Sequence, residues 1–263
     1  LVKARKAKAR LEESRDKVLW GRQKRSRVMD EKDRRITAYH ESGHTLIGAM
    51  LLWEIEPIHK VTIIPRGPAL GATMSLPDKD RYLTQCQILK SRLAMLFGGR
   101  VAEEVFFTDI SAGARDDIRK ATELAKAMVC EWGMSEKMGP VSYAENEEHI
   151  FLGREIARTR NLSEQTQLEI DREVRRFIDE GYIRARELIT TNREKLEKIA
   201  EMLLKYETLT GEEVKQIMDG QDIDAEKDRQ RLQDERQREQ RSGLDPKPDW
   251  KPGQNPYPGP QQA

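Results

Sequence analysis

The segment His40-Glu41-Ser42-Gly43-His44 carries the residues best suited to chemistry. It lies in a stretch expected to be helical, where residues four apart differ by about 40° around the axis and by one turn along it. His40 and His44 therefore project from one face and can bind a single cation. Glu41 flanks the pair, where its carboxylate can accept a proton from a water molecule beside the metal. The spacing predicts a zinc-dependent endopeptidase with His40 and His44 as ligands and Glu41 as the general base.

The same helix face carries Ile36 and Ile47, so the two imidazoles should lie on a buried stripe. Gly43 lacks a side chain where another segment or a substrate would need to approach closely. The alternative is a pair of core histidines bonded to the backbone beside an exposed Glu41. With only four histidines in the chain, two at this spacing around a glutamate favour the metal site.

A third protein ligand should complete the site and leave one position for water. A carboxylate is expected, because neither His59 nor His149 has a useful spacing. Two pairs compete: Glu103 and Glu104, after the Gly98-Gly99 pair, and Asp116 and Asp117, after the loop at 111–114. Helical geometry places Asp117 on the apolar stripe that contains Ala121, whereas Asp116 should point about 100° away.

The elements that must position these residues are mostly helices. Asp30 is a plausible N-cap for the motif helix, which should run to about Trp53. Further helices are predicted from Thr84 (a capping box with Gln87) to about residue 107, over 118–133, after Ser163, over 193–206, and over 211–219 after a Thr210 cap. A β-branched run at 60–64 and a second short extended run at 71–76, joined by a Pro/Gly turn, predict a small hairpin. The fold class is mainly α: a helical metallopeptidase domain with a small β-hairpin or sheet beside the active-site helix.

The hairpin is a candidate for holding an extended substrate, because an exposed strand edge can pair with a peptide backbone irrespective of its side chains. The residues proposed for this contact are Gly71, Ala72, Thr73 and Met74. A hairpin that only covers the motif helix is the alternative.

Composition limits the other classes of function. Residues 1–36 hold fourteen Lys or Arg and six Asp or Glu, yet acids are interspersed and aromatic residues are few, which favours a solvated helix over a nucleic-acid surface. The longest apolar run, 46–53, is far shorter than the ~20 residues of a bilayer span. Cys86 and Cys130 have no partner spacing and are expected to be reduced thiols. The charged and Pro/Gly/Gln-rich end, from about residue 225, is predicted to be disordered.

The run at 37–44 resembles the peptidase signature of the FtsH family, which comprises membrane-anchored, ATP-dependent zinc proteases. Other segments resemble that family in the same order, and the likeness covers about residues 10–220. These segments are 60–67, 96–104, 128–135, 151–154 and 205–209. One departure is Ser42, where the family more often has Ala.

The resemblance implies roles for the acidic residues. The family pattern is Asn-Asp with the Asp bound to zinc, which makes Asp117 the third ligand. Asp116 stands where the Asn is common and is expected to be a solvated residue of the helix's first turn. Apart from the resemblance, we expect Glu104 to support the site by orienting a ligand histidine.

The resemblance also implies an organisation: residues 1–29 as the end of an ATPase lid helix and a linker, 30–220 as the zinc peptidase domain, and 221–263 as a disordered tail. It implies one Zn²⁺ per chain, a homohexameric ring, unfolded protein substrates, and a full-length protein at the cytoplasmic face of the inner or plasma membrane. The sequence has no G-x-x-x-x-G-K-[ST] loop, so ATP would act only through a module absent from this chain, and the fragment itself is expected to be soluble. The alternative is a catalytically inactive hexameric scaffold of the same family; a nucleic-acid partner is not expected.

Overall fold

The computed structural model describes residues 11, 14–15, 17–18, 29–65, 69–76, 83–107, 109–144, 162–221 and 223. Most of the predicted N-terminal segment 1–29 and the predicted disordered tail lie outside these residues. The chain divides into two compact units, Leu1–Gln221 and Asp222–Ala263, and the description below concerns the first.

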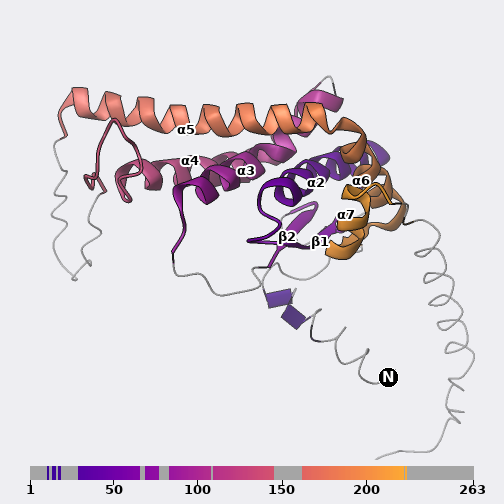
Figure 1. The fold of residues 1–263 in the computed structure, drawn as a ribbon. Coiled ribbons are helices and arrows are strands. Elements are labelled where there is room, and N and C mark those ends of the chain that lie inside the picture. Colours follow the sequence, from indigo (N-terminus) through magenta and orange to yellow (C-terminus); the bar gives the residue numbers. More distant parts are fainter. Residues whose placement is uncertain are drawn as a thin grey trace, which may run out of the picture. The chain divides into compact units, whose positions relative to one another are not determined.

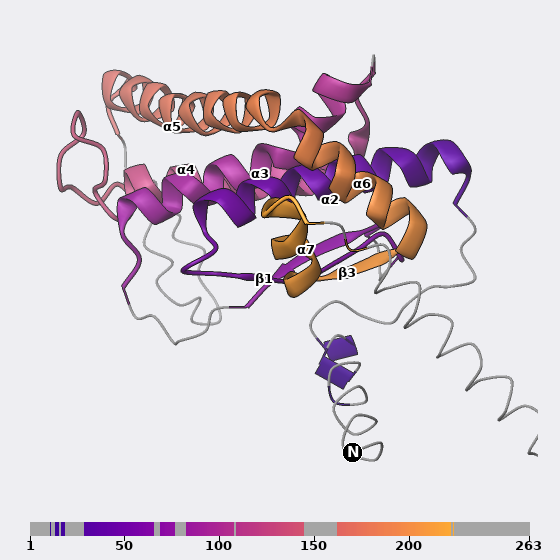
Figure 2. The ribbon, with the colours of Figure 1, turned by 45° about the vertical axis from the view of Figure 1, so that its right-hand side comes forward.

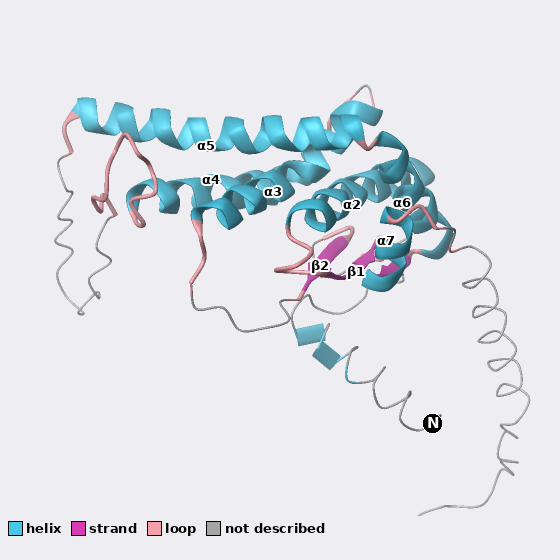
Figure 3. Cartoon of the chain, viewed as in Figure 1, coloured by secondary structure: helices cyan, strands magenta, loops and turns pink. Residues whose placement is uncertain are grey.

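Helices dominate the described residues, and the predicted mainly α class with a small sheet is confirmed (Figure 3). The helices are α2 (Glu31–Leu51), α3 (Cys86–Phe106), the 3-10 helix η1 (Ala112–Ala114), α4 (Arg115–Cys130), α5 (Glu164–Thr191), α6 (Arg193–Tyr206) and α7 (Gly211–Met218). The strands are β1 (Ile58–Thr62), β2 (Ala72–Ser75) and β3 (Thr208–Thr210). No helix in these described parts is long and apolar enough to cross a membrane.

Side-chain caps begin three of the helices where the sequence predicted them. The carboxylate of Asp30 accepts a hydrogen bond from the Asp33 N–H, and Ser163 caps α5 in the same way. Thr210 and Glu213 form the reciprocal capping box of α7. The capping box predicted at Thr84 is wrong, because α3 begins at Cys86 without a side-chain cap.

The helices form layers around α2 and α3, which pack against each other along their lengths. Helix α5 lies along α3 and α4, and α6 packs against α2 (Figures 1 and 2). The sheet lies on the side of α2 away from α5, with α7 against β1. Fully buried apolar side chains fill these contacts; they include Leu46, Ile47, Leu93, Phe177, Ile199 and Leu203. The motif helix is therefore covered on opposite sides by α3 and by the sheet.

The sheet has the order β2-β1-β3, and both pairings are antiparallel. The predicted hairpin is present, with Val61 opposite Thr73. The sequence prediction missed β3, which pairs Leu209 with Val61 and whose Thr208 hydroxyl shares a 2.8 Å hydrogen bond with that of Thr62. Strand β2 consequently lies at one edge of the sheet.

Two glycines allow α2 and α3 to cross at backbone contact. A Cβ at Gly43 would lie 2.2 Å from the Gly98 carbonyl oxygen, and a Cβ at Gly98 would lie 2.6 Å from that of Gly43. The atoms that would be struck are backbone, which cannot rotate away. The close crossing therefore depends on glycine at both positions.

We predict that Gly43→Ala lowers the free energy of unfolding by about 3 kcal/mol, as overpacking of a rigid contact does. Gly48→Ala on the same helix is the control, because its Cβ would meet the ends of the Ile58 and Met95 side chains, at 2.9 and 3.2 Å. Those ends can move, and the helix preference of Ala offsets part of the strain, so Gly48→Ala should cost less than about 1 kcal/mol. Denaturant unfolding measures both; equal losses would contradict the backbone crossing.

Candidate metal centre

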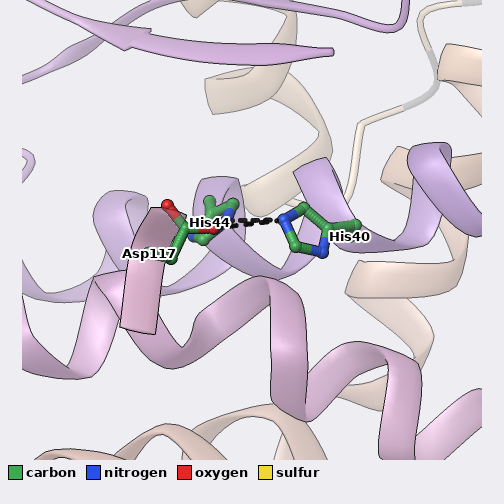
Figure 4. A group of neighbouring side chains, drawn as sticks. All are labelled: His40, His44 and Asp117. Carbon is green, nitrogen blue, oxygen red and sulfur yellow. Dashed lines mark hydrogen bonds and ion pairs between the residues drawn. The ribbon is translucent and has the colours of Figure 1, made fainter. Parts of the chain in front are cut away.

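Three side chains from two helices converge on one point. His40 and His44 lie in the middle of α2, and Asp117 lies in the first turn of α4, with all three turned toward one another (Figure 4). The two Nε2 atoms are 3.1 Å apart, and Asp117 Oδ2 lies 3.3 Å from that of His40 and 3.2 Å from that of His44. The three atoms thus form a nearly equilateral triangle.

The hydrogen bonds at the far side of each imidazole fix which nitrogen faces this triangle. His44 Nδ1 donates to the Met95 carbonyl oxygen at 2.8 Å, since a carbonyl can only accept. His40 Nδ1 donates to Glu103 Oε1 at 2.8 Å. Both Nδ1 atoms carry a proton, so the Nε2 atom of each imidazole is the one that faces Asp117. Each Nε2 atom there can hold a proton or, when it is deprotonated, bind a metal ion.

The dimensions of the triangle fit zinc. Zinc is bound by imidazole nitrogen and carboxylate oxygen at about 2.0–2.2 Å, and a tetrahedron with bonds near 2.0 Å has edges of about 3.3 Å. The observed separations of 3.1–3.3 Å match one face of that tetrahedron. Nitrogen, nitrogen and oxygen donors that leave a fourth position open are the arrangement of a catalytic site rather than a structural one.

Gly99 of α3 leaves the space in which this triangle forms. A Cβ there would lie 2.5 Å from His40 Nε2 and 2.6 Å from His44 Nε2, so any larger residue would enter the position of the ligand atoms. The glycine follows directly on Gly98, whose contact with Gly43 sets the distance between the helices. Gly98 therefore allows α3 to approach α2 closely, and Gly99 leaves space for the two imidazole rings.

The electrostatics of the cluster favour a cation. Burial opposes a charge on His40, but the hydrogen bonds with Asp117 and Glu103 and the nearby Glu41 charge outweigh it and raise the His40 pKa to about 10. Burial would also favour a neutral Asp117, yet its hydrogen bonds with His40 and His44 hold the pKa of this carboxyl well below its usual range. A proton and a metal ion compete for the lone pair of His40 Nε2, so binding of a metal ion would displace the proton from that atom.

Glu103 links one ligand to the loop that leads to another. Its side chain is buried and accepts hydrogen bonds from the Ser111 N–H at 2.7 Å and the Ser111 hydroxyl at 3.0 Å as well as from His40. Burial opposes its charge, but these bonds lower the Glu103 pKa. Ser111 is the N-cap of η1, which runs directly into α4 and Asp117.

The sequence prediction placed the neighbouring Glu104 against a ligand histidine, and the structure places Glu103 there. Glu104 instead accepts hydrogen bonds from Arg100 at 2.7 Å and from the Tyr182 hydroxyl. Helix phase explains the difference, because Glu103 follows Gly99 by four residues and shares its helix face, whereas Glu104 is turned about 100° further; the sequence alone does not show that Gly99 faces the imidazoles. The partner of His44 Nδ1 is the backbone carbonyl oxygen of Met95, and the type of side chain at a position does not predict a backbone contact.

Glu41 is buried on the side of α2 that faces the sheet. Its Oε2 accepts a 2.7 Å hydrogen bond from the Thr73 hydroxyl of β2. A Cβ at Gly71 would lie 2.7 Å from its Oε1. Two of the four residues proposed for substrate binding, Gly71 and Thr73, thus lie against the proposed base.

The remaining predicted site residues lie apart from the triangle. Asp116 is exposed and pairs with Arg119 at 3.2 Å, as expected of a solvated residue in a helix's first turn. Ala72 is half-buried in β2 opposite Thr62, and Met74 lies opposite Lys60 with its side chain buried.

A mainly α domain with two helical histidines, a flanking glutamate and a converging aspartate defines a metallopeptidase. Residues 27–217 match the model of Peptidase family M41, and the chain belongs to that family.

Similar curated proteins carry consistent names. The chain is 52% identical over 208 residues to the ATP-dependent zinc metalloprotease FtsH 2 of Methylacidiphilum infernorum, with 79% of this chain and 32% of that protein covered. It is 47% identical over 216 residues to the ATP-dependent zinc metalloprotease FtsH 1 of a Thermoanaerobacter species, with 82% and 35% covered. The chain thus spans about a third of the length of these relatives.

We predict that Asp117→Ala lowers zinc affinity by at least about 100-fold, because loss of a ligand should exceed the ~10–100-fold cost of losing an outer partner. Asp116→Asn is the matched control and should be nearly silent. The zinc affinity of both variants is measured from the zinc that each retains as the chelator concentration is raised. The ligand assignment would be wrong if Glu104→Gln stripped the metal while Asp117→Ala kept it.

Proposed function

We propose that this chain is the proteolytic part of an ATP-dependent zinc protease and that it hydrolyses peptide bonds of unfolded proteins. The supporting observation is the convergence of His40 Nε2, His44 Nε2 and Asp117 Oδ2 at zinc-ligand separations. His40, His44 and Asp117 are the proposed ligands, and one zinc ion per chain would occupy the triangle.

In this proposal each side chain has a separate task. Bound zinc would supply a Lewis acid and lower the pKa of a water molecule in the open position. Glu41 would take a proton from the water that attacks the scissile carbonyl and would then deliver it to the leaving amine. Glu103 and the Met95 carbonyl hold the imidazoles with Nε2 inward.

The position of β2 supports a substrate-binding role for Gly71, Ala72, Thr73 and Met74. The strand lies at the edge of the sheet and touches the proposed base. An extended peptide paired with this edge would lie beside the catalytic glutamate, bound by its backbone with little demand on its side chains.

The larger organisation is proposed from the family and from the names of the relatives. Residues 1–29 would join an ATPase module that supplies ATP-driven unfolding, 30–220 would be the peptidase domain, and 221–263 would be a disordered tail. The full protein would be a membrane-anchored homohexamer at the cytoplasmic face of the inner or plasma membrane. Light scattering that shows a monomer at all concentrations would count against a ring formed by this chain alone.

An inactive hexameric scaffold is the weaker proposal. Such a protein has no need to keep the ligand triangle and a buried glutamate beside it, and both are intact here.

We predict that Glu41→Gln retains zinc and assembly but lowers peptidase activity on casein by at least about 100-fold, the usual size of a general-base contribution. The amide keeps the shape of the side chain and can still accept the Thr73 hydrogen bond, but it cannot take a proton. Zinc content by elemental analysis is the control. Robust casein cleavage by the zinc-loaded variant would show that another base acts.

We also predict that Ser75→Pro raises KM for casein several-fold while zinc remains bound. The N–H of the next residue, Leu76, bonds the Pro57 carbonyl oxygen, so the Ser75 N–H faces the free edge of β2, and proline removes it. Ser75→Ala keeps that N–H and is the control. An unchanged KM in the proline variant would contradict substrate pairing along β2.

A further inference from the structure

Thr73 is the only residue of the proposed substrate strand whose side chain donates a hydrogen bond to the Glu41 carboxylate in the described part of the chain. Its hydroxyl lies 2.7 Å from Glu41 Oε2. The hydroxyl also lies 3.2 Å from the Glu41 carbonyl oxygen and 3.3 Å from the Thr45 hydroxyl. Because a hydroxyl donates one hydrogen bond, the group that accepts it decides which atom Thr73 can position.

The competing acceptor is already used. The Glu41 carbonyl accepts the Thr45 hydroxyl at 2.7 Å, one turn along α2. The Thr73 hydroxyl therefore donates its hydrogen bond to the Glu41 carboxylate, which is nearer than the carbonyl oxygen. The carboxylate is also charged, and charge-assisted hydrogen bonds are stronger than neutral ones. Since a hydroxyl donates one proton, it engages Oε2 and leaves Oε1 to other partners.

The donor is held rigidly. Thr73 lies opposite Val61 in the β1–β2 ladder, and Gly71, directly before β2, lies so close to Glu41 Oε1 that a Cβ at residue 71 would be 2.7 Å from it. Rotation of the carboxylate about its last bond would break the Thr73 contact. The strand thus limits the orientations open to the glutamate.

We propose that Thr73 is a positioning residue for peptide hydrolysis: its hydroxyl orients the Glu41 carboxylate so that Oε1 takes the proton from the attacking water. This role rests on the proposed function, because it requires Glu41 to be the general base. It assigns to the β2 side chain at this position a task in the chemical step, separate from any backbone pairing with substrate.

Thr73→Val tests the proposal because valine keeps the branched shape and the strand preference and removes only the hydroxyl. In the zinc-loaded full chain with casein as substrate, kcat should fall about 10–100-fold, the usual cost of losing an orienting partner. KM should change less than about threefold, and the zinc content should stay at that of the unsubstituted chain. Thr73→Ser should restore kcat to within about threefold.

Thr37→Val is the matched control, because the Thr37 hydroxyl makes the same kind of bond on α2, to the Asp33 carbonyl oxygen at 2.8 Å and not to Glu41 or Thr73. It should leave kcat within about twofold. If Thr73→Val unfolds, the pair Thr73→Ser and Thr73→Ala, which differ only by the hydroxyl, replaces it with the same expected ratio of kcat.

An unchanged kcat in Thr73→Val, a raised KM alone, loss of zinc, or an equal loss in Thr37→Val would each overturn the role of Thr73. If Glu41→Gln is inactive in the same assay, the proposed function survives that result. If the unsubstituted zinc-loaded chain does not cleave casein or cleaves it no faster than Glu41→Gln, the proposed function and the role of Thr73 both fail.

Discussion

The close contact of α2 with α3 at Gly43 and Gly98 is the constraint on which the candidate site depends. With the two backbones in contact, one face of α3 meets both histidines. The Met95 carbonyl oxygen accepts a hydrogen bond from His44 Nδ1, Gly99 leaves space at the two Nε2 atoms, and Glu103 accepts a hydrogen bond from His40 Nδ1. A larger separation would break the two Nδ1 hydrogen bonds that direct Nε2 inward. The glycine contact therefore helps to define the chemistry of the imidazoles as well as the packing of the helices.

The opposite side of α2 is organised by the sheet. Thr73 of β2 and the backbone at Gly71 contact Glu41, and β1 holds β2 in place. Helix α3 thus orients the two histidine ligands, and strand β2 orients the proposed base. The residues proposed for metal binding and for proton transfer lie on the same helix, α2, but are held by different elements. Glu103 extends the arrangement toward the third ligand through Ser111 and η1.

The parts of the site that were predictable from sequence are those governed by local periodicity. The placement of His40, Glu41 and His44 follows from helix geometry, and the caps at Asp30 and Ser163 follow from backbone hydrogen-bonding needs. Asp117 lies far along the chain from His44, so the residues alone left two acidic pairs open, and the family pattern was needed to choose between them.

What sequence reasoning missed depends on tertiary contacts. Strand β3 has three residues, too few to show a periodicity, and exists because β1 offers an edge to pair with. The adjacent Glu103 and Glu104 differ only in helix phase, and the phase becomes informative once Gly99 is known to face the imidazoles. The bond from Thr73 to Glu41 joins residues 32 positions apart and requires the packed position of β2 on α2.

The most direct measurement of the central claim is X-ray absorption at the zinc edge on the zinc-loaded chain. If the helix crossing directs both Nε2 atoms and Asp117 to one ion, the spectrum will show two imidazole nitrogens and two oxygens at about 2.0–2.2 Å, one oxygen from Asp117 and one from solvent. A sulfur ligand near 2.3 Å, or a shell with a single imidazole, would contradict it.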